Sequence, residues 1–184
     1  MSHITTYTKL RFNPVNPDEN CICTEDIAHA LSMITRATGH FPQFYSVGQH
    51  CINCCKEAIE RNLPVSASLA CLLHDAAECY ISDVTRAVKE LIPKYNEIEE
   101  KLLETIYTKY LGRNLTEDEA RTVKEIDDAM LYYELKHFMD EEIKNEPPYF
   151  ISQPDFSLRP FEDVENEYKK ILSSLLSLYF ELSK

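Results

Sequence analysis

Glycine is scarce in this chain: only three of its 184 residues are glycine. Tight turns between strands depend on glycine, because it adopts positive φ angles at little steric cost. The common residues instead include Leu, Ala, Glu, Lys and Ile, most of which are good helix formers. A sheet with many tight turns is therefore disfavoured, and we predict an all-α fold in which a single domain forms a bundle of about six to seven helices.

The helical pattern does not extend over the whole chain. Residues 1–23 are rich in Pro and Asn and predict a turn-rich lead-in with at most a short strand or hairpin. Residues 24–184 carry the helical domain, with a core at 24–143 and a C-terminal helix at 161–183. The proline-rich loop at 147–160 between them is long enough to have a functional role, but a plain connector explains it equally well.

The acidic character of the chain restricts the kinds of partner that it can bind. A formal net charge of -12 and a pI near 4.9 argue against binding to a nucleic-acid duplex, which needs clustered Lys and Arg. A small anionic substrate is still allowed where a metal ion and a local Arg offset the negative electrostatic field of the chain. No apolar run approaches the ~20 residues that span a bilayer, and the N-terminus has no apolar signal core. We therefore expect a cytoplasmic protein that binds no membrane.

A helix expected from Ser66 to about Tyr80 has a polar face that does not fit solvent exposure. One side is a continuous apolar stripe, and the other carries polar residues separated by Ala and Cys. Exposed helix faces usually consist of Lys, Arg and Glu, and this helix has no cation. Carboxylates buried without a basic partner need a counter-ion, for which a divalent cation is the natural candidate. The polar residues are Cys71, His74, Asp75 and Glu78.

Two polar residues on other helices interrupt apolar stripes. His50 lies on the apolar face of a helix that Ser46 caps, where a lone histidine is more often a core residue than a ligand. Asp127 lies within the apolar stripe of the longest expected helix, 116–143, whereas Asp128 lies about 100° away. Because an Asp in a core stripe is costly unless it is paired, we interpret Asp127 and not Asp128 as the inward residue.

Two further groups of residues allow two interpretations each. Glu134 and His137 share the inward face of the longest helix, either as groups that support a site or as part of an exposed edge. The closely spaced Cys51, Cys54 and Cys55 form either a zinc cluster or core packing. We favour core packing, because structural zinc sites usually join ligands from separate turns. The odd total of seven cysteines likewise indicates reduced buried thiols rather than disulfides.

His50, His74, Asp75 and Asp127 form a set of donors suited to one divalent metal ion. Two imidazoles and two carboxylates match a borderline ion, such as Zn, Mn, Co, Fe or Ni, and leave positions open for water and substrate. Such an ion would lower the pKa of bound water and polarise a phosphoryl oxygen. We therefore expect one divalent metal ion as the cofactor.

The order of these donors resembles the HD-domain metal-dependent phosphohydrolases, whose signature is a His, a His-Asp doublet and a distant Asp, all on helices. A closer resemblance, from about Glu25 to His137, is to the YfbR-like 5'-nucleotidase branch of that family. The segments that carry it are TRATGHFPQFYSVGQH, HDAAECYISDVTRAVK and VKEIDDAMLYY. The resemblance implies an HD-type helical domain over residues 24–184.

The resemblance also implies roles for individual residues. The metal ligands would be His50, His74, Asp75 and Asp127. Glu78 would orient the attacking water or shuttle its proton, and Asp83 would lie near the leaving-group sugar oxygen. Arg36 would hold the substrate phosphate, whereas the residues alone favour a cation at a helix C-terminus. Ala37, beside that arginine, and Ala87, in the loop after Asp83, depart from the family pattern in the substrate pocket.

The function that the resemblance implies is hydrolysis of a phosphomonoester, in the first place a nucleoside 5'-monophosphate, by metal-activated water. Two alternatives stay open. One is hydrolysis of another phosphorylated or diphosphate-bearing small molecule, and the other is a metal-binding module that senses a ligand or binds a partner without turnover. The broad apolar face of the C-terminal helix and the family analogy together predict a homodimer.

Overall fold

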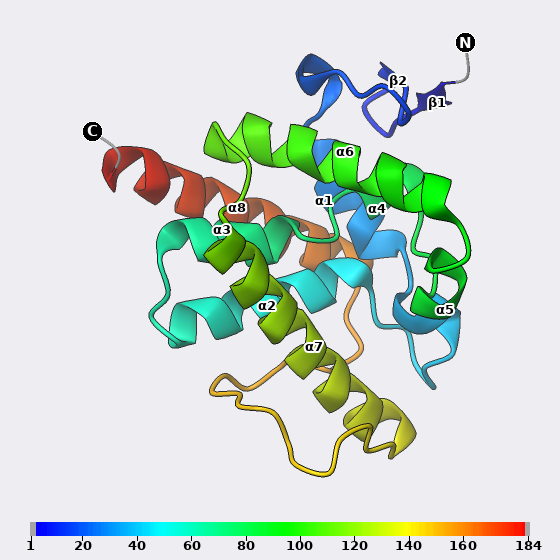
Figure 1. Cartoon of the computed structure of the whole chain (residues 1–184), viewed down its shortest axis with the longest axis vertical. Helices are drawn as coiled ribbons and strands as arrows, with labels where there is room; N and C mark the ends of the chain where they lie inside the picture. The colour runs from blue at the N-terminus through cyan, green and yellow to red at the C-terminus, as the bar shows by residue number, and fades with distance from the viewer. Residues whose placement is uncertain (1–2, 183–184) are drawn as a thin grey trace.

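The structure, a computed structural model, describes residues 3–182 apart from the side chain of Arg86, and it confirms the all-α fold (Figure 1). Within these residues, six helices have nine residues or more. They are α1 (Thr24–Met33), α2 (Val47–Glu60), α3 (Val65–Leu73), α6 (Pro93–Leu111), α7 (Glu117–Met139) and α8 (Phe161–Leu182). Ser183, the last residue predicted for the C-terminal helix, lies outside the described residues. No helix between residues 3 and 182 is long and apolar enough to cross a membrane.

Short elements precede or connect these helices. They are the four-residue helices α4 (Glu78–Ile81) and α5 (Arg86–Lys89), the 3-10 turns η1 (Glu19–Cys21) and η2 (Arg36–Gly39), and the strands β1 (Ile4–Thr5) and β2 (Arg11–Phe12). The two strands form an antiparallel hairpin that pairs Ile4 with Phe12, so the short hairpin predicted for the lead-in is confirmed. The hairpin lies beyond α6, at one end of the molecule (Figure 1).

Helix α3 lies at the centre of the bundle because it is apolar on almost every side. All of its residues from Ala67 to Leu73 are buried, and it packs against α2, α7 and α8. A helix that is apolar all round is stable only inside a core, where each buried Leu contributes about 2 kcal/mol. The chain that leaves α3 therefore delivers its next residues, His74 and Asp75, into the interior of the bundle.

A close contact between α1 and α2 depends on Gly48. A Cβ atom at this position would lie 3.1 Å from the carbonyl carbon and the carbonyl oxygen of Leu31. Contacts of this length are tighter than ordinary van der Waals packing, so a larger residue would require the backbone of α1 to move slightly away from α2. Because His50 follows two residues later on α2, the absence of a side chain at Gly48 helps to fix the position of His50.

The start of α7 was predicted correctly and its end was not. Thr116 caps the helix: its hydroxyl accepts the Glu119 backbone N–H at 3.2 Å, and its own N–H donates to the Glu119 carboxylate at 2.9 Å. This reciprocal capping box matches the sequence spacing. The helix ends at Met139, before the predicted end near Ile143, because Asp140 adopts a left-handed conformation with φ of 53°.

The helix predicted from Ser66 to Tyr80 is interrupted at the His-Asp doublet. Regular α-helix ends at Leu73, and His74 and Asp75 lie in a turn before α4. The imidazole Nδ1 of His74 donates to the carbonyl of Cys71 at 2.7 Å, and a continuing helix would have offered that carbonyl to the backbone N–H of Asp75. The side chain thus competes with the helix, and the prediction of one continuous helix is wrong.

The segment between α7 and α8 is bound along the side of α2. Three residues spaced one turn apart on α2 make the contacts: Gln49 and Asn53 donate to the carbonyl of Asp155 at 2.8 and 3.0 Å, and the Glu57 carboxylate accepts the N–H of Ser152 at 2.7 Å. All three α2 residues are buried. Because buried backbone groups need partners, this polar row holds an otherwise irregular loop in place.

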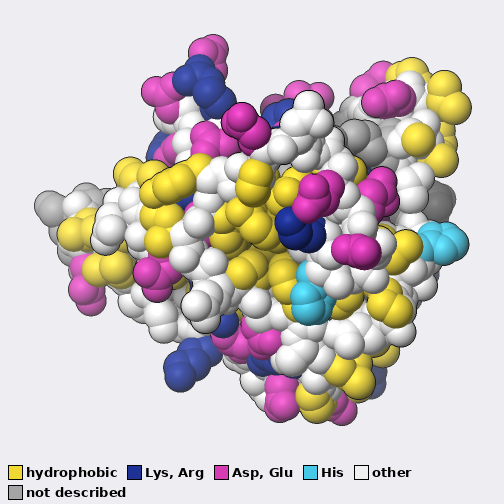
Figure 2. Space-filling model, turned by 90° about the horizontal axis from the view of Figure 1, so that it is seen from below, with side chains coloured by type: hydrophobic (Ala, Val, Ile, Leu, Met, Phe, Trp, Pro, Cys, Tyr) yellow, Lys and Arg dark blue, Asp and Glu magenta, His cyan; other side chains and the backbone are white. Residues whose placement is uncertain are grey.

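The face of the molecule that lies below in Figure 1 combines apolar and charged side chains. Figure 2 shows hydrophobic side chains in the middle of this face, with acidic and basic side chains beside them. The segment after α7 contributes exposed hydrophobic residues to the surface, among them Ile143, Tyr149 and Leu158. Single exposed hydrophobic residues are normal on a protein surface.

Candidate metal centre

Four of the residues singled out in the sequence meet in the interior. His50 comes from α2, His74 and Asp75 from the turn after α3, and Asp127 from α7. The Nε2 atom of His50 lies 3.1 Å from His74 Nε2 and 3.2 Å from Asp127 Oδ1, and His74 Nε2 lies 3.5 Å from Asp75 Oδ2. Donors bound to one ion at about 2.0–2.2 Å lie roughly 3–3.6 Å apart. These separations are close to those of donors that could share a single ion.

The two histidines are held in a defined orientation by their outer nitrogens. Nδ1 of His74 donates to the Cys71 carbonyl, and Nδ1 of His50 donates to the buried carboxylate of Glu134 at 2.6 Å. In the neutral imidazoles, each Nε2 then presents a lone pair to the other at 3.1 Å. Two facing lone pairs repel unless a proton or a metal cation lies between them, so the donor set can accept a metal cation in place of a proton.

The electrostatics of the centre also favour positive charge. Burial disfavours a protonated His74, yet the negative charge of Asp75 and the contacts with Cys51 and Asp127 together outweigh it and raise the pKa of His74 well above its ordinary value. Burial opposes ionisation of Asp127, but hydrogen bonds from His50 and His74 hold the pKa of Asp127 well below its usual range. The carboxylates thus stay charged in the interior, where a divalent cation would neutralise them.

Helix α7 directs two acidic residues toward the centre and one away from it. Asp127 and Glu134 are seven residues apart, which places them on the same face of the helix. Asp128 accepts a hydrogen bond from Lys124 at 2.6 Å on a more exposed part of the helix. His137, considered in the sequence as a supporting group, instead stacks on Phe156 with ring centroids 4.7 Å apart. Of the two supporting candidates, only Glu134 contacts a residue of the centre.

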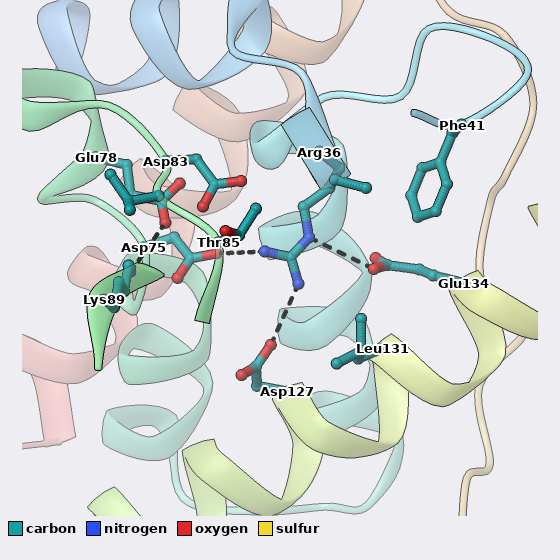
Figure 3. Close-up of a pocket in the computed structure, with 12 residues that line it drawn as sticks. Arg36, Phe41, Asp75, Glu78, Asp83, Thr85, Lys89, Asp127, Leu131 and Glu134 are labelled. Carbon is teal, nitrogen blue, oxygen red and sulfur yellow. Dashed lines mark hydrogen bonds and ion pairs between the residues drawn. The ribbon is translucent and has the colours of Figure 1, made fainter. Parts of the chain in front are cut away.

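A cavity of about 220 Å³ opens beside these candidate metal-binding residues (Figure 3). One part of its wall carries charged and polar side chains, and another part is apolar. The polar residues are Arg36, Asp75, Glu78, Asp83, Thr85, Lys89, Asp127 and Glu134, and the apolar residues are Ala37, Phe41, Val84 and Leu131. Such a combination suits a small molecule with a charged group at one end.

Arg36 enters this cavity from the η2 turn. Its guanidinium lies between three carboxylates, 3.4 Å from Asp75, 3.5 Å from Asp127 and 3.4 Å from Glu134 (Figure 3). Helix α1 ends before Arg36, so the alternative role as a cation at the end of that helix does not hold. Ala37 follows with φ of 51°, a left-handed conformation that is unusual for a residue with a side chain and that turns the chain at this point.

Glu78 and Asp83, the two residues expected to serve the reaction, line the same cavity. Burial, together with the negative charges of Asp75 and Asp83, raises the pKa of Glu78 to about 9. Glu78 Oε2 is buried without a hydrogen-bond partner among the described residues, and Oε1 lies 3.8 Å from Lys89 Nζ. Lys89 and Thr85 were not singled out in the sequence, although both lie in the HDAAECYISDVTRAVK segment.

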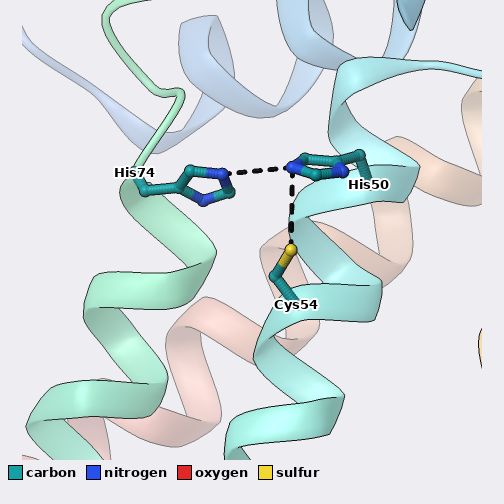
Figure 4. A group of neighbouring side chains, drawn as sticks. All are labelled: His50, Cys54 and His74. Carbon is teal, nitrogen blue, oxygen red and sulfur yellow. Dashed lines mark hydrogen bonds between the residues drawn. The ribbon is translucent and has the colours of Figure 1, made fainter. Parts of the chain in front are cut away.

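Two cysteines lie beside the donors as well. Donor atoms of His50, Cys54 and His74 lie within 4.8 Å of one another (Figure 4), and so do those of Cys51, His74 and Asp75. Both cysteines are buried, as the core-packing interpretation expects, and their sulfur atoms also lie close to the His and Asp donors. The structure therefore contains His, Cys and Asp groups that could bind a metal ion.

Comparison with known proteins adds one relative. No family model matches the sequence. The chain is similar to a protein of Escherichia coli (strain K12) named "Uncharacterized protein YfdR", with 38% identity over 112 residues. The matched part covers 60% of this chain and 59% of that protein, so it spans less than two thirds of the relative's length. The name of the relative states no activity, and the functional argument therefore depends on the site.

Proposed function

We propose that this chain is a metal-dependent phosphohydrolase of the HD-domain type, related to the YfbR-like 5'-nucleotidases. The observation that supports the proposal is the meeting of His50, His74, Asp75 and Asp127 at donor separations of 3.1 to 3.7 Å. The wall of the cavity beside them carries basic side chains, which can bind a phosphate group, and acidic side chains, which can transfer a proton during hydrolysis. A phosphomonoester is the substrate, with nucleoside 5'-monophosphates as its first candidates.

The ion, when bound by these four residues, would activate water and polarise a phosphoryl oxygen. Arg36 has a fixed position at the cavity, where its guanidinium binds phosphate oxygens once Asp75 and Asp127 share their charge with a cation. Glu78 holds a proton at neutral pH and lies one turn from the doublet, which suits transfer of a proton to or from the reacting water. Asp83 completes the acidic side of the cavity toward the leaving group.

The apolar part of the wall supports an organic leaving group. Phe41 and Leu131 offer surface to a sugar or base on the side of the cavity away from Lys89 (Figure 3), and Ala37 and Val84 also line the cavity. The small side chain of Ala37, which departs from the pattern of the family that the sequence resembles, leaves room beside Arg36. We therefore expect broad acceptance of the group that carries the phosphate.

Phosphate release from a panel of esters by the metal-reconstituted protein tests the proposal. The panel contains ribo- and deoxyribonucleoside 5'-monophosphates, nucleoside di- and triphosphates, and sugar phosphates, with each divalent ion in turn. Asp127→Asn should abolish release, whereas Asp128→Asn, the matched change at the neighbouring position of α7, should retain it. Release of pyrophosphate or of a nucleoside monophosphate from the larger nucleotides would favour the diphosphate alternative.

Metal binding without turnover of any ester would contradict the proposed hydrolysis. The protein would then be a metal-binding module without catalysis. Release that is equal in the wild-type protein and in Asp127→Asn would show that a contaminating phosphatase is responsible.

A further inference from the structure

Cys54 lies on the buried side of the metal centre, one helical turn after His50 on α2. Its side chain is 1% exposed, and its Sγ lies 3.6 Å from His50 Nε2, the nitrogen that faces His74 (Figure 4). Cys54 does not line the cavity that contains Asp75 and Asp127. The sulfur and the carboxylates therefore approach the two imidazoles from different sides.

The spacing of this sulfur matches that of a metal ligand. On one ion, with bonds of about 2.0–2.1 Å to nitrogen and about 2.3 Å to sulfur, a nitrogen and a sulfur whose bonds form an angle near 110° lie roughly 3.5 Å apart. The observed separation of 3.6 Å between Cys54 Sγ and His50 Nε2 agrees with that value. The donor atoms of His50, Cys54 and His74 also lie within 4.8 Å of one another.

We propose that Cys54 supplies a thiolate ligand to the same ion that His50 and His74 bind. Binding of the ion would displace the thiol proton, which leaves to solvent or to a neighbouring base. A soft sulfur donor beside two imidazoles favours Zn²⁺ or Co²⁺ and disfavours hard ions such as Mg²⁺ and Mn²⁺. The inference rests on the metal-binding part of the proposed function and does not depend on hydrolysis.

The test uses Co²⁺ as a spectroscopic probe of the full-length chain. Co²⁺ bound to a thiolate shows an intense sulfur-to-metal charge-transfer absorption in the near ultraviolet, in addition to its weaker visible bands. The wild-type complex should show this absorption, and Cys54→Ser should lose it while keeping visible bands from the remaining ligands. Cys55→Ser is the matched control, because Cys55 is the next residue on α2 and is equally buried, and it should keep the absorption.

Three results would overturn the inference. They are a wild-type Co²⁺ complex without charge-transfer absorption, full absorption in Cys54→Ser, and loss of absorption in Cys51→Ser but not in Cys54→Ser. The first two would mean that Cys54 is a neutral thiol that donates to His50, and the third that Cys51 is the sulfur ligand.

X-ray absorption at the zinc edge of the wild-type protein provides a measurement that needs no variant. One sulfur neighbour at about 2.3 Å is expected, and nitrogen and oxygen neighbours alone would refute the proposal. Because neither readout involves phosphate release, the outcome is separate from that of the hydrolase assay. A protein that shows the sulfur signal without hydrolysis would retain this ligand and lose the proposed activity.

Discussion

Replacement of Glu134 is the most selective test of the candidate metal centre. Glu134 contacts His50, a proposed metal ligand, but is not itself proposed as a ligand. Its carboxylate is fully buried and accepts a hydrogen bond of 2.6 Å from His50 Nδ1, and it lies 3.4 Å from Arg36 Nε. Glu134→Gln keeps the shape of the side chain and removes its charge. We expect the variant to fold and to bind the metal ion more weakly.

The size of the effect follows from these contacts. Replacement of a carboxylate that orients a metal-binding histidine typically lowers metal affinity by about 10- to 100-fold, which corresponds to roughly 1.4–2.7 kcal/mol. Arg36 keeps two other carboxylate neighbours, Asp75 and Asp127, at 3.4 and 3.5 Å. The buried guanidinium therefore keeps charged partners in the variant. The free energy of unfolding should fall by less than it would if a buried charge lost its only partner.

Competition of the apo protein with a chromophoric chelator for Zn²⁺ measures the affinity directly. Glu142→Gln is the matched control, since Glu142 has an exposed ion pair with Lys136 at 2.6 Å and lies outside the centre. Its affinity should equal that of the wild-type protein. If folded Glu134→Gln binds Zn²⁺ as tightly as the wild-type protein does, Glu134 does not orient His50 as a ligand, and the reasoning is refuted.

Three other predictions concern stability. Gly48→Ala should lower the free energy of unfolding by about 1–2 kcal/mol in denaturant titrations, because its Cβ would meet the Leu31 carbonyl; equal stability would contradict this packing. Arg113 lowers the pKa of Glu119 from 4.5 to about 2. The stability advantage of the wild-type protein over Glu119→Gln should therefore be full above pH 4.5 and shrink toward pH 2, and a constant difference would be inconsistent with this pairing. A chelator should lower the Tm of the metal-loaded wild-type protein and leave that of His74→Ala unchanged.

Helical periodicity and helix-capping residues in the sequence predicted much of the fold. Apolar spacing along α7 placed Asp127 inward and Asp128 outward, and the structure puts Asp127 Oδ1 3.2 Å from His50 Nε2. The end of α6 was also predictable, because Gly112 adopts the left-handed conformation that stops a helix. These features depend on residues within a few turns of one another, so local sequence contains the information.

Other features of the centre depend on contacts that local patterns do not contain. The helix stops at the doublet because the His74 side chain takes the Cys71 carbonyl, and no propensity predicts that competition. Arg36 leaves the line of α1 because Ile34 and Thr35 before it are extended, and it reaches carboxylates from two other segments, the turn after α3 and helix α7. Periodicity placed Cys54 on an apolar face, which describes its burial but not its approach to His50.

Anomalous diffraction from crystals grown with a divalent ion and inorganic phosphate would test the central claim most directly. The account predicts one anomalous peak at about 2.0–2.2 Å from His50 Nε2, His74 Nε2 and carboxylate oxygens of Asp75 and Asp127, with Arg36 turned toward a phosphate oxygen. An ion bound at other residues, or a guanidinium of Arg36 that keeps all its carboxylate contacts while the four donors bind no ion, would contradict it.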